Sequence, residues 1–504
     1  MQPLRVLAAI GQIVRLFSVT LTVPILVAFA YDPWDSHFFG LPIPSMVWPF
    51  ALTLILCFGL SFFLAALTKK VETEDLQDKE AYLTVGIGWL VLTVIAALPF
   101  WASGVLPNFI DALFEAMSGL TTTGATVIAG SLEAVPRSVM IWRAFLQFLG
   151  GMGIIVLSVA LLARLTHGGL QLLQAEAPGP SMTRLRPKLA QTARSLWGVY
   201  GIISAVLFGI LFIILKADVG LSWGNAFYDA LLHTFTTIST GGFSNHTVSI
   251  AFFDSWLMET ALIIFMLIAG SNFTLHYYAL HGDWRKLVQD REWRFFMIIF
   301  FGSTLISALV LWGAGQGIGL SLRHAAFTVA SLGTSTGFAT ANYDTWSDPV
   351  RILLIVLMFT GATAGSTSGG LKVVRILILL KVVYREFRKL LHPRAVIPIR
   401  LGGRPLKEDT VMTVVAFFFS FITIWLVGSI FLIATDPLLD LFDGAVAAAS
   451  AMGNVGPAMG ALDPTQTHAP LLPSSKLTLA LLMWIGRLEV FTALILFAPG
   501  TWKN

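Results

Sequence analysis

Four short segments of this chain end in a glycine-bearing turn, and each turn follows a weakly helical stretch. Those stretches are too short to cross a bilayer, because a hydrocarbon core of about 30 Å takes ~20 apolar residues in a helix. A polar residue lies thirteen positions before the defining glycine of each turn. The chain therefore carries four copies of one element: polar anchor, short helix, glycine turn. The anchors are Asp111, Asp229, His324 and Asp443, and the glycines are Gly124, Gly242, Gly337 and Gly456.

The repetition of the glycine turn restricts what the four segments can build. Successive carbonyls can point at one axis where the backbone adopts positive φ, which glycine does at little cost. Four such turns around one axis would make a ring of carbonyls, which is how a protein replaces the water around a cation. The C-terminal dipole of each short helix would favour the same charge. A single turn of this kind can equally be a helix break or a site of close helix packing, so the repetition carries the argument.

The apolar runs and the composition place the chain in a membrane. Hydrophobic residues make up 56% and charged residues 12% of the sequence, against about a quarter charged in soluble domains. Ten runs are long enough to span, and the four short elements should be re-entrant, with turns that face protein or a water-filled cavity. The ten runs lie near 8–30, 47–68, 81–103, 139–163, 196–215, 255–280, 295–313, 352–380, 411–434 and 477–499.

The basic residues predict the orientation of these spans. Most of the 32 lysines and arginines fall at the start of the chain, in alternate loops and at its end. By the positive-inside rule these segments and both termini face the cytoplasm, in a multi-pass protein of the cytoplasmic (inner) membrane. The positive charge then reflects orientation and not nucleic-acid binding. The opposite face carries the four turns and many acids, which would either concentrate cations at a pore mouth or serve as ordinary solvated loop residues.

The order of spans and short elements predicts an all-α membrane fold with a tandem repeat. Two N-terminal transmembrane helices occupy residues 1–70. Each later unit has a span, a re-entrant short helix with its turn, and a second span; the units are 81–165, 195–281, 293–390 and 410–500. The ion ligands expected from the turns are Thr122, Thr123, Gly124, Thr240, Gly241, Gly242, Ser335, Thr336, Gly337, Asn454, Val455 and Gly456.

Three further motifs and the four turns together resemble a known family. The motifs are QFLGGMGI at 147–154, GSTSGGLK at 365–372 and GRLEVFT at 486–492. With them, the chain resembles the membrane subunit of the Trk/Ktr potassium-uptake superfamily over nearly its whole length. The resemblance implies a single pseudo-fourfold pore, K+ as the transported ion, a homodimer and a cytosolic nucleotide-binding regulatory subunit. In that family, glycine in all four turns goes with potassium selectivity.

Residues 361–370 interrupt the run 352–380 near its centre. Their four glycines oppose a continuous helix, each by about 1 kcal/mol relative to alanine. A loop at that depth needs a cavity beside it, and the alternative is a kinked helix whose small residues pack closely. The resemblance makes this segment an intramembrane gating loop. Its expected gate residues are Gly361, Gly365, Ser366, Thr367, Ser368, Gly369 and Gly370.

Charged residues follow that loop and interrupt the last span. Arg487 lies near the middle of the run 477–499, where an ionisable side chain is expensive and usually functional. We expect it to point into the pore as an electrostatic barrier, while Glu489, on a different helix face, binds a neighbouring unit. The alternative is a structural ion pair between Arg487 and another buried group. Lys372 would either help bind acids at the gate or anchor the following helix at the cytoplasm.

These features favour a potassium-conducting protein over two other classes. A membrane enzyme would need converging catalytic groups, which the sequence does not supply, and a scaffold has no use for four re-entrant turns. The driving force stays open between downhill movement and coupling to protons or sodium. No organic cofactor is expected. The expected partners are the potassium ion, membrane lipid, a second copy of the chain, and an acidic protein ring on the basic residues between Lys372 and Lys407.

Overall fold

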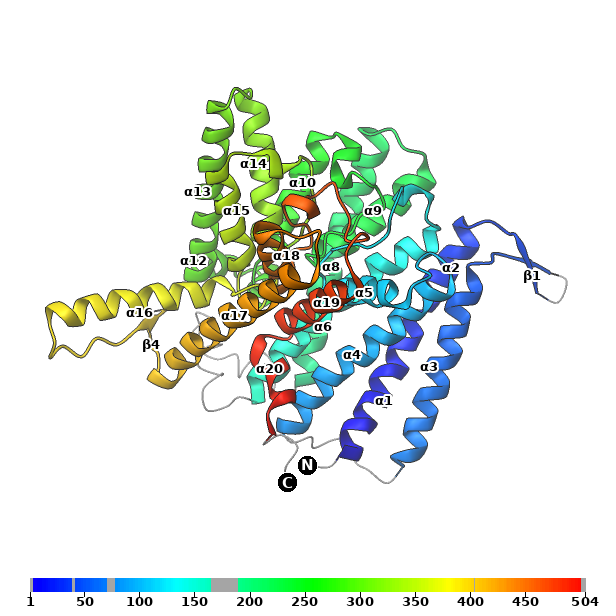
Figure 1. Cartoon of the computed structure of the whole chain (residues 1–504), viewed down its shortest axis with the longest axis horizontal. Helices are drawn as coiled ribbons and strands as arrows, with labels where there is room; N and C mark the ends of the chain where they lie inside the picture. The colour runs from blue at the N-terminus through cyan, green and yellow to red at the C-terminus, as the bar shows by residue number, and fades with distance from the viewer. Residues whose placement is uncertain (1–2, 39–40, 70–77, 165–188, 403, 500–504) are drawn as a thin grey trace.

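The computed structural model describes residues 3–38, 41–69, 78–164, 189–402 and 404–499, and most of this chain is helical (Figure 1). The basic linker predicted between the first two units falls largely within 165–188, outside the described residues. The first half contains α1 (Pro3–Thr20), α2 (Thr22–Tyr31), α3 (Val47–Leu67), α4 (Asp78–Ala102), α5 (Phe109–Leu120), α6 (Arg137–Arg164), α8 (Leu189–Ala217), α9 (Trp223–Ile238), α10 (Trp256–Ala269) and α11 (Phe273–Leu280).

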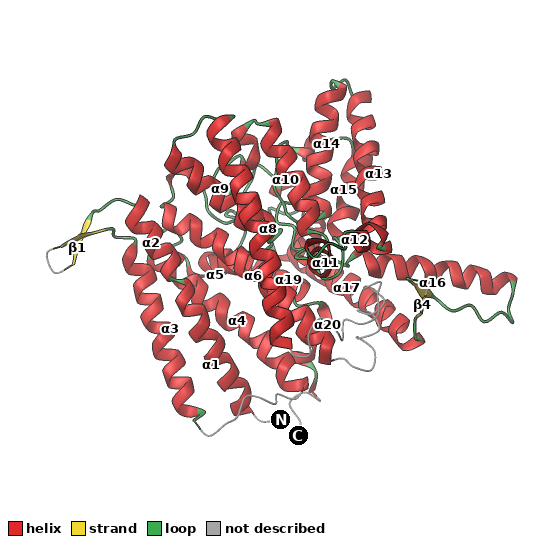
Figure 2. Cartoon of the chain, turned by 180° about the vertical axis from the view of Figure 1, so that it is seen from behind, coloured by secondary structure: helices red, strands yellow, loops and turns green. Residues whose placement is uncertain are grey.

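The second half is also helical, and the strands form two small antiparallel hairpins, β1 with β2 and β3 with β4. Both hairpins and α16 project from the helical body (Figure 2). The remaining elements are α12 (Arg285–Gln289), α13 (Arg291–Gly313), α14 (Ile318–Gly333), α15 (Asp348–Thr360), α16 (Val373–Leu391), α17 (Glu408–Thr435), α18 (Leu441–Gly453), α19 (Pro473–Arg487), α20 (Val490–Leu494), β1 (Ser36–Phe38), β2 (Leu41–Ile43), β3 (Arg400–Leu401) and β4 (Arg404–Pro405).

Many of these helices are apolar enough to cross a membrane, which confirms the predicted class. In the described ranges, seven are also long enough to span, counting α1 and α2 together as one. Two predicted spans are not single helices, so that expectation was wrong. The run 255–280 bends by 104° between α10 and α11, and the run 477–499 bends by 117° between α19 and α20. Asn272 supplies the first break, because its side chain caps the new helix at Thr274.

Three of the four short helices, α5, α9 and α18, begin at a side-chain cap, whereas α14 begins at Gly317 without one. Asn108, Ser222 and Asp440 each accept a backbone N–H of the first turn of α5, α9 and α18, which satisfies a donor that has no partner inside the helix. The anchors Asp111 and Asp443 lie in the first turn as well. Their negative charge is favourable there, because the amino end of a helix is positive.

The helix that follows each turn packs against the next short helix along the chain. Helix α6 contacts α9, α10 contacts α14, and α15 contacts α18. Helix α19 then contacts α5, so the last segment returns to the first and the contacts close a cycle. The N-terminal helices stand outside this cycle, where α1 packs on α3 and α4, and α2 packs on α6. The closed cycle brings four turns that are far apart in sequence into one place.

Candidate functional site

Each of the four short helices ends in the same pair of backbone hydrogen bonds. The amide one residue before the glycine donates five residues back, and the amide before that donates three back. This pair is the Schellman helix ending, which requires a residue with left-handed backbone. The longer bonds join Thr123 to Ser118, Gly241 to Thr236, Thr336 to Ser331 and Val455 to Ser450.

The left-handed position in each turn is not occupied by glycine. Thr122, Thr240, Ser335 and Asn454 have φ of 52°, 51°, 55° and 53°. Positive φ is uncommon outside glycine, and for a β-branched residue such as threonine it signals strain that the surroundings must hold in place. Across the described residues eight non-glycine positions have positive φ. Six belong to segments that the sequence marks for function: these four, Lys372 and Glu489.

The four defining glycines are locked against one another. Each has positive φ, between 72° and 101°, and each leaves no room for a side chain. A Cβ on any one of them would overlap the carbonyl oxygen of the residue before the glycine in the next turn. The pairs follow one order: Gly124 with Gly241, Gly242 with Thr336, Gly337 with Val455 and Gly456 with Thr123. The turns therefore close the same cycle as the helices, with equivalent atoms at every step.

Several carbonyls in these turns are buried without a donor. Thr122, Thr240 and Asn454 are 0% exposed and Ser335 is 1% exposed. Their amides point back into the short helices, and within the described chain no hydrogen bond reaches their carbonyl oxygens. A buried carbonyl without a partner is uncommon in a folded protein. The Gly241 carbonyl differs, because Nε2 of Gln147 donates to it at 2.7 Å.

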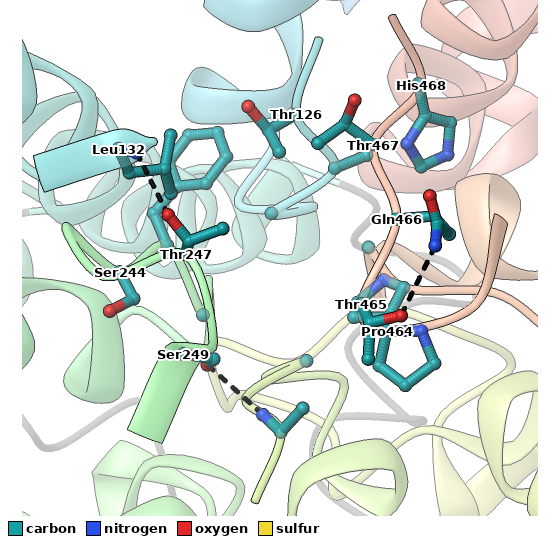
Figure 3. A pocket seen from close by; sticks show the side chains of 18 of the residues that line it. Thr126, Leu132, Ser244, Thr247, Ser249, Pro464, Thr465, Gln466, Thr467 and His468 are labelled. Atoms are coloured by element: carbon teal, nitrogen blue, oxygen red, sulfur yellow. Dashed lines mark hydrogen bonds between the residues drawn. The ribbon is translucent and has the colours of Figure 1, made fainter. Parts of the chain in front are cut away.

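One cavity lies against all four glycines. Its lining contains Gly124, Gly242, Gly337 and Gly456 together with residues of the loops that follow the turns. Figure 3 shows Thr126, Thr247 and Thr467, among other polar side chains, around this space. The cavity therefore joins four parts of the sequence at a single point, and backbone and hydroxyl groups form much of its surface.

Side chains behind the turns hold them in register. The Gln147 amide bonds both sides of the second turn, since its Oε1 also accepts the Phe243 amide at 3.2 Å. Nδ2 of Asn454 crosses from the fourth turn to the first and donates to Oγ1 of Thr123 at 3.0 Å. It also donates to the Met483 carbonyl at 2.9 Å. The turns are thus supported by a packed polar shell and not by helix ends alone.

A buried ion pair supports the first and second turns. Arg143 is 1% exposed and Glu115 is 0% exposed, and Nε of Arg143 lies 2.6 Å from Oε1 of Glu115. The guanidinium also donates to the Ser244 carbonyl at 3.2 Å and lies 4.0 Å from the centre of the Phe243 ring. Glu115 in turn accepts the Val127 amide at 2.9 Å. The pair therefore joins the segments that follow both turns.

Replacing Arg143 with methionine should destabilise the protein strongly. The change leaves the Glu115 carboxylate buried without its cation, and breaking a buried pair in this way costs about 3–5 kcal/mol. Thermal unfolding in detergent measures the effect as a lower midpoint. The Arg388→Met variant is the control, because Arg388 is exposed and bonds the hydroxyl of Tyr384. Equal midpoints for the two variants would contradict a supporting role for the pair.

The predicted loop between α15 and α16 lies directly against two of the turns. Residues Gly361–Lys372 separate the helices and are almost entirely buried. Oγ of Ser335 in the third turn accepts the Gly369 amide at 2.8 Å and lies 3.0 Å from Oγ of Ser368. Oγ1 of Thr367 donates to the Ile238 carbonyl, at the end of the second short helix. The segment is a loop and not the kinked continuous helix considered as the alternative.

Arg487, the last residue of α19, also contacts this loop. It is 2% exposed and its Nη1 donates to the Thr367 carbonyl at 2.7 Å. Its Nε and Nη2 have no hydrogen-bond partner in the described structure, and no ion pair with a described carboxylate involves it, so a structural salt bridge does not account for it. The expectation of a mid-helix position was wrong, because α19 ends at Arg487 and Glu489 has φ of 57°.

Lys372 and Glu489 also face the loop region. Nζ of Lys372 donates to the Ser368 carbonyl at 2.5 Å, and Lys372 is 7% exposed. Its burial against the loop favours the role at the gate over that of a cytoplasmic anchor for the following helix. Glu489 binds Arg375 of α16 at 2.6 Å, as expected for a contact with a neighbouring segment. Arg487 therefore joins the end of α19 to the loop, and the Glu489–Arg375 pair joins the residues after α19 to α16.

Comparisons with known proteins show which family the chain belongs to. The TrkH family model, described as cation transport protein, matches residues 49–503. The chain belongs to the TrkH family. It is 38% identical to the Trk system potassium uptake protein TrkH of Escherichia coli K12, with 98% of each chain covered. It is 33% identical to TrkG of the same organism, over 98% of this chain and 97% of that one.

A solved TrkH-family structure matches the whole fold. The crystal structure of the potassium transporter TrkH from Vibrio parahaemolyticus superposes with a TM-score of 0.86 at 33% identity, over 100% of both chains. The relatives are named as transport proteins, so the choice of a transporter over a membrane enzyme is confirmed. The resemblance to the Trk/Ktr superfamily is confirmed too.

The electrostatics at the mouth of this TrkH-family cavity differ from the acidic rim considered above. The described lining includes Arg143, His246 and His468 but no carboxylate. Glu133 contacts the lining residue Thr247, whose amide and hydroxyl donate to its carboxylate. Burial raises the pKa of Glu133, but hydrogen bonds from Ser131 and Thr247 outweigh it and bring the pKa to about 2. This contact therefore stabilises the loops above the ordinary carboxyl pKa and is lost as the pH falls through about 2.

Sequence reasoning missed a hydroxyl residue that recurs in all four short helices and whose side chain supports the third and fourth turns. Ser118, Thr236, Ser331 and Ser450 all lie six positions before the defining glycine. Oγ of Ser331 donates to the Phe338 carbonyl at 2.7 Å, and Oγ of Ser450 donates to the Pro457 carbonyl at 2.8 Å. The fixed offset is a signal that the sequence contains. The Arg143–Glu115 pair left no such signal, because its members are 28 residues apart.

Proposed function

We propose that this chain carries potassium ions across a membrane through a filter formed by its four glycine turns. Its relatives in Escherichia coli are named as potassium uptake proteins. The closed cycle of the turns is the observation that carries the proposal. Each glycine abuts the equivalent carbonyl of the next turn, and all four glycines line one cavity. A scaffold or a membrane enzyme would have no need for this equivalence.

The ion would be held by carbonyl oxygens that lack protein donors. The carbonyls of Thr122, Thr240, Ser335 and Asn454 meet this condition, and oxygen dipoles arranged in rings replace the hydration shell of a potassium ion. The remaining proposed ligands are Thr123, Gly124, Gly242, Thr336, Gly337, Val455 and Gly456. In the second turn Gly241 is the weaker candidate, because Gln147 already donates to its carbonyl. The four short helices direct their negative ends toward the same place.

The repeat organisation supports this function. We assign pore units to 81–165, 195–281, 293–390 and 410–500 around one pseudo-fourfold axis, with the N-terminal helices of 1–70 outside. The shared helix ending, the equivalent glycine contacts and the cyclic packing support that assignment. A homodimer and a cytosolic nucleotide-binding regulatory subunit stay predictions from the family resemblance. The placement of both termini in the cytoplasm stays a prediction from the distribution of basic residues.

The gate would lie at the loop Gly361–Lys372 with Arg487. The loop lies against the second and third turns, and its Thr367 carbonyl receives the guanidinium of Arg487. An incompletely paired buried cation beneath the filter would oppose the passage of another cation. Because the loop is held by hydrogen bonds from Arg487 and Lys372 and to Ser335, opening would require several of them to break together.

Ion flux in liposomes tests the proposed function. The purified chain should conduct potassium down its gradient and discriminate against sodium, with rubidium accepted. The Lys216→Met protein is a suitable comparison, because Lys216 contacts Leu221 and Trp223 away from the turns and should behave as the wild type. Absence of potassium flux from a folded wild-type protein, or equal flux of sodium and potassium, would overturn the filter.

A further inference from the structure

A second ring of contacts joins the units at the opposite ends of the short helices. At each boundary, a polar residue near the start of the helix after one turn meets the first part of the next short helix. The contacts join α6 to α9, α10 to α14, α15 to α18 and α19 to α5. They follow the same cycle as the turns but lie at the beginnings of the short helices, where the turns lie at their ends.

Three of these boundaries involve an arginine. Nη2 of Arg137 donates to Oδ1 of Asn225 at 2.8 Å, and the guanidinium lies 5.1 Å from the centre of the Tyr228 ring. The guanidinium of Arg323 bonds both carboxylate oxygens of Glu259, at 2.8 and 2.7 Å. The guanidinium of Arg351 lies 4.4 Å from the centre of the Phe442 ring. It also binds Asp344, whose carboxylate accepts the Gly460 amide beyond the boundary.

The last boundary closes the ring with a single ion pair. Nζ of Lys476 lies 2.6 Å from Oδ1 of Asp111, and the two side chains are 6% and 21% exposed. The residues are 365 positions apart. An ammonium is a point charge that can bond a carboxylate from several directions, whereas a guanidinium fixes a planar geometry. The closing contact is therefore the one whose strength depends most on charge.

Most members of the ring occupy equivalent positions. Tyr228, Arg323 and Phe442 lie fourteen residues before the defining glycine of their own turn, and Asp111 lies thirteen before its glycine. Glu259, Arg351 and Lys476 are each the fourth residue of their helix, whereas Arg137 is the first residue of α6. The side chains differ in chemistry, while the positions agree at three of the four boundaries. This pattern points to a shared mechanical role and not to four unrelated surface contacts.

We propose that these four contacts form a clamp ring that sets the spacing of the glycine turns and so the ion preference of the filter. The inference rests on the proposed function. A short helix transmits a tilt at its start to the turn at its end, because its internal hydrogen bonds keep it rigid. The turns have no slack to absorb the movement, since each glycine already touches the next carbonyl. Discrimination among cations depends on the size of the site and the arrangement of its dipoles.

The closing pair gives the sharpest test. Lys476→Met and Asp111→Asn should each lower the ratio of potassium to sodium flux about tenfold, which corresponds to about 1.4 kcal/mol of lost discrimination. The double exchange Lys476→Asp with Asp111→Lys restores the pair and should recover most of the ratio. Lys216→Met is the matched control, because Lys216 is also a lysine near a helix end and its ammonium contacts Leu221 and Trp223, away from the ring. Its ratio should equal that of the wild type.

A variant at the boundary between α10 and α14 tests the ring even if the closing-pair variants fail to fold. In Glu259→Gln the amide can still bond Arg323, which also keeps its contact with Asp254 at 2.9 Å, so the fold should survive. Its flux ratio should fall about threefold, by the same conversion of free energy to ratio. An unchanged ratio in folded Glu259→Gln, or in both closing-pair variants, would overturn the clamp ring while the filter stands. A wild-type protein that does not select potassium would instead overturn the proposed function itself.

Discussion

Replacing Gly242 with alanine is expected to abolish potassium uptake. Gly242 has φ of 72°, and a Cβ there would overlap the carbonyl oxygen of Thr336 in the next turn. Backbone or carbonyl must move to accept the methyl group, and the filter would lose its geometry. We expect uptake to fall at least about a hundredfold, equivalent to roughly 2.7 kcal/mol on the barrier. Potassium uptake by cells lacking their own uptake systems measures the change.

The control for this variant separates overlap from backbone strain. Gly130 has φ of 84° and lines the same cavity, but nothing lies within 4 Å of an added Cβ. Gly130→Ala therefore carries the same left-handed penalty of roughly 1–2 kcal/mol without a clash. It should retain uptake if the protein folds. Normal uptake by folded Gly242→Ala would show that the contact between the turns is not needed for conduction.

Replacing Arg487 with alanine is expected to increase ion flux. The guanidinium is buried, bonds the Thr367 carbonyl, and has two further nitrogens without a partner. Its removal takes away a buried positive charge beside the loop and one of the bonds that hold the loop. Flux should rise at least about tenfold, since each 1.36 kcal/mol removed from a barrier is tenfold in rate. Single-channel or liposome recordings at fixed voltage measure it.

Arg487→Lys is the matched control for the barrier. The ammonium keeps the positive charge and can donate to the Thr367 carbonyl, although it cannot reproduce the planar guanidinium. Its flux should stay near that of the wild type. If Arg487→Ala and Arg487→Lys conduct equally, the charge is not the barrier. If flux falls in Arg487→Ala, the role of Arg487 is to support the filter and not to block ion passage.

The sequence predicted the parts of the site better than their surroundings. The turns were found because glycine recurs at a fixed distance from a polar anchor, and the loop was found because four glycines interrupt an apolar run. The bend after Arg487 was missed. Glu489 adopts positive φ there. A glutamate in the sequence gives no sign of this backbone conformation, whereas a glycine would have suggested it. The break at Asn272 was missed because a single capping residue does little to lower the mean hydropathy of the apolar run around it.

Which charged residues pair with one another could also not be predicted from the sequence. Arg143 and Glu115, Arg323 and Glu259, and Lys476 and Asp111 are joined by the cycle of helix contacts. The partners lie 28, 64 and 365 residues apart. A helical or strand pattern relates residues only a few positions apart, so no local pattern links them. The mouth of the cavity shows the same limit. Acids that a linear reading assigns to an outer rim are used in capping and pairing once the chain is folded.

Local chemistry therefore determined the elements, because glycine, apolar runs and helix caps act within a few residues of themselves. From these alone the sequence specified a membrane chain with four short helices, each ending in a glycine turn. Only the tertiary structure decided that the fourth turn meets the first, that Arg487 binds the loop after α15, and which charges pair. Those outcomes depend on packing between segments hundreds of residues apart, which bury their polar groups together at a cost that only matched partners can offset.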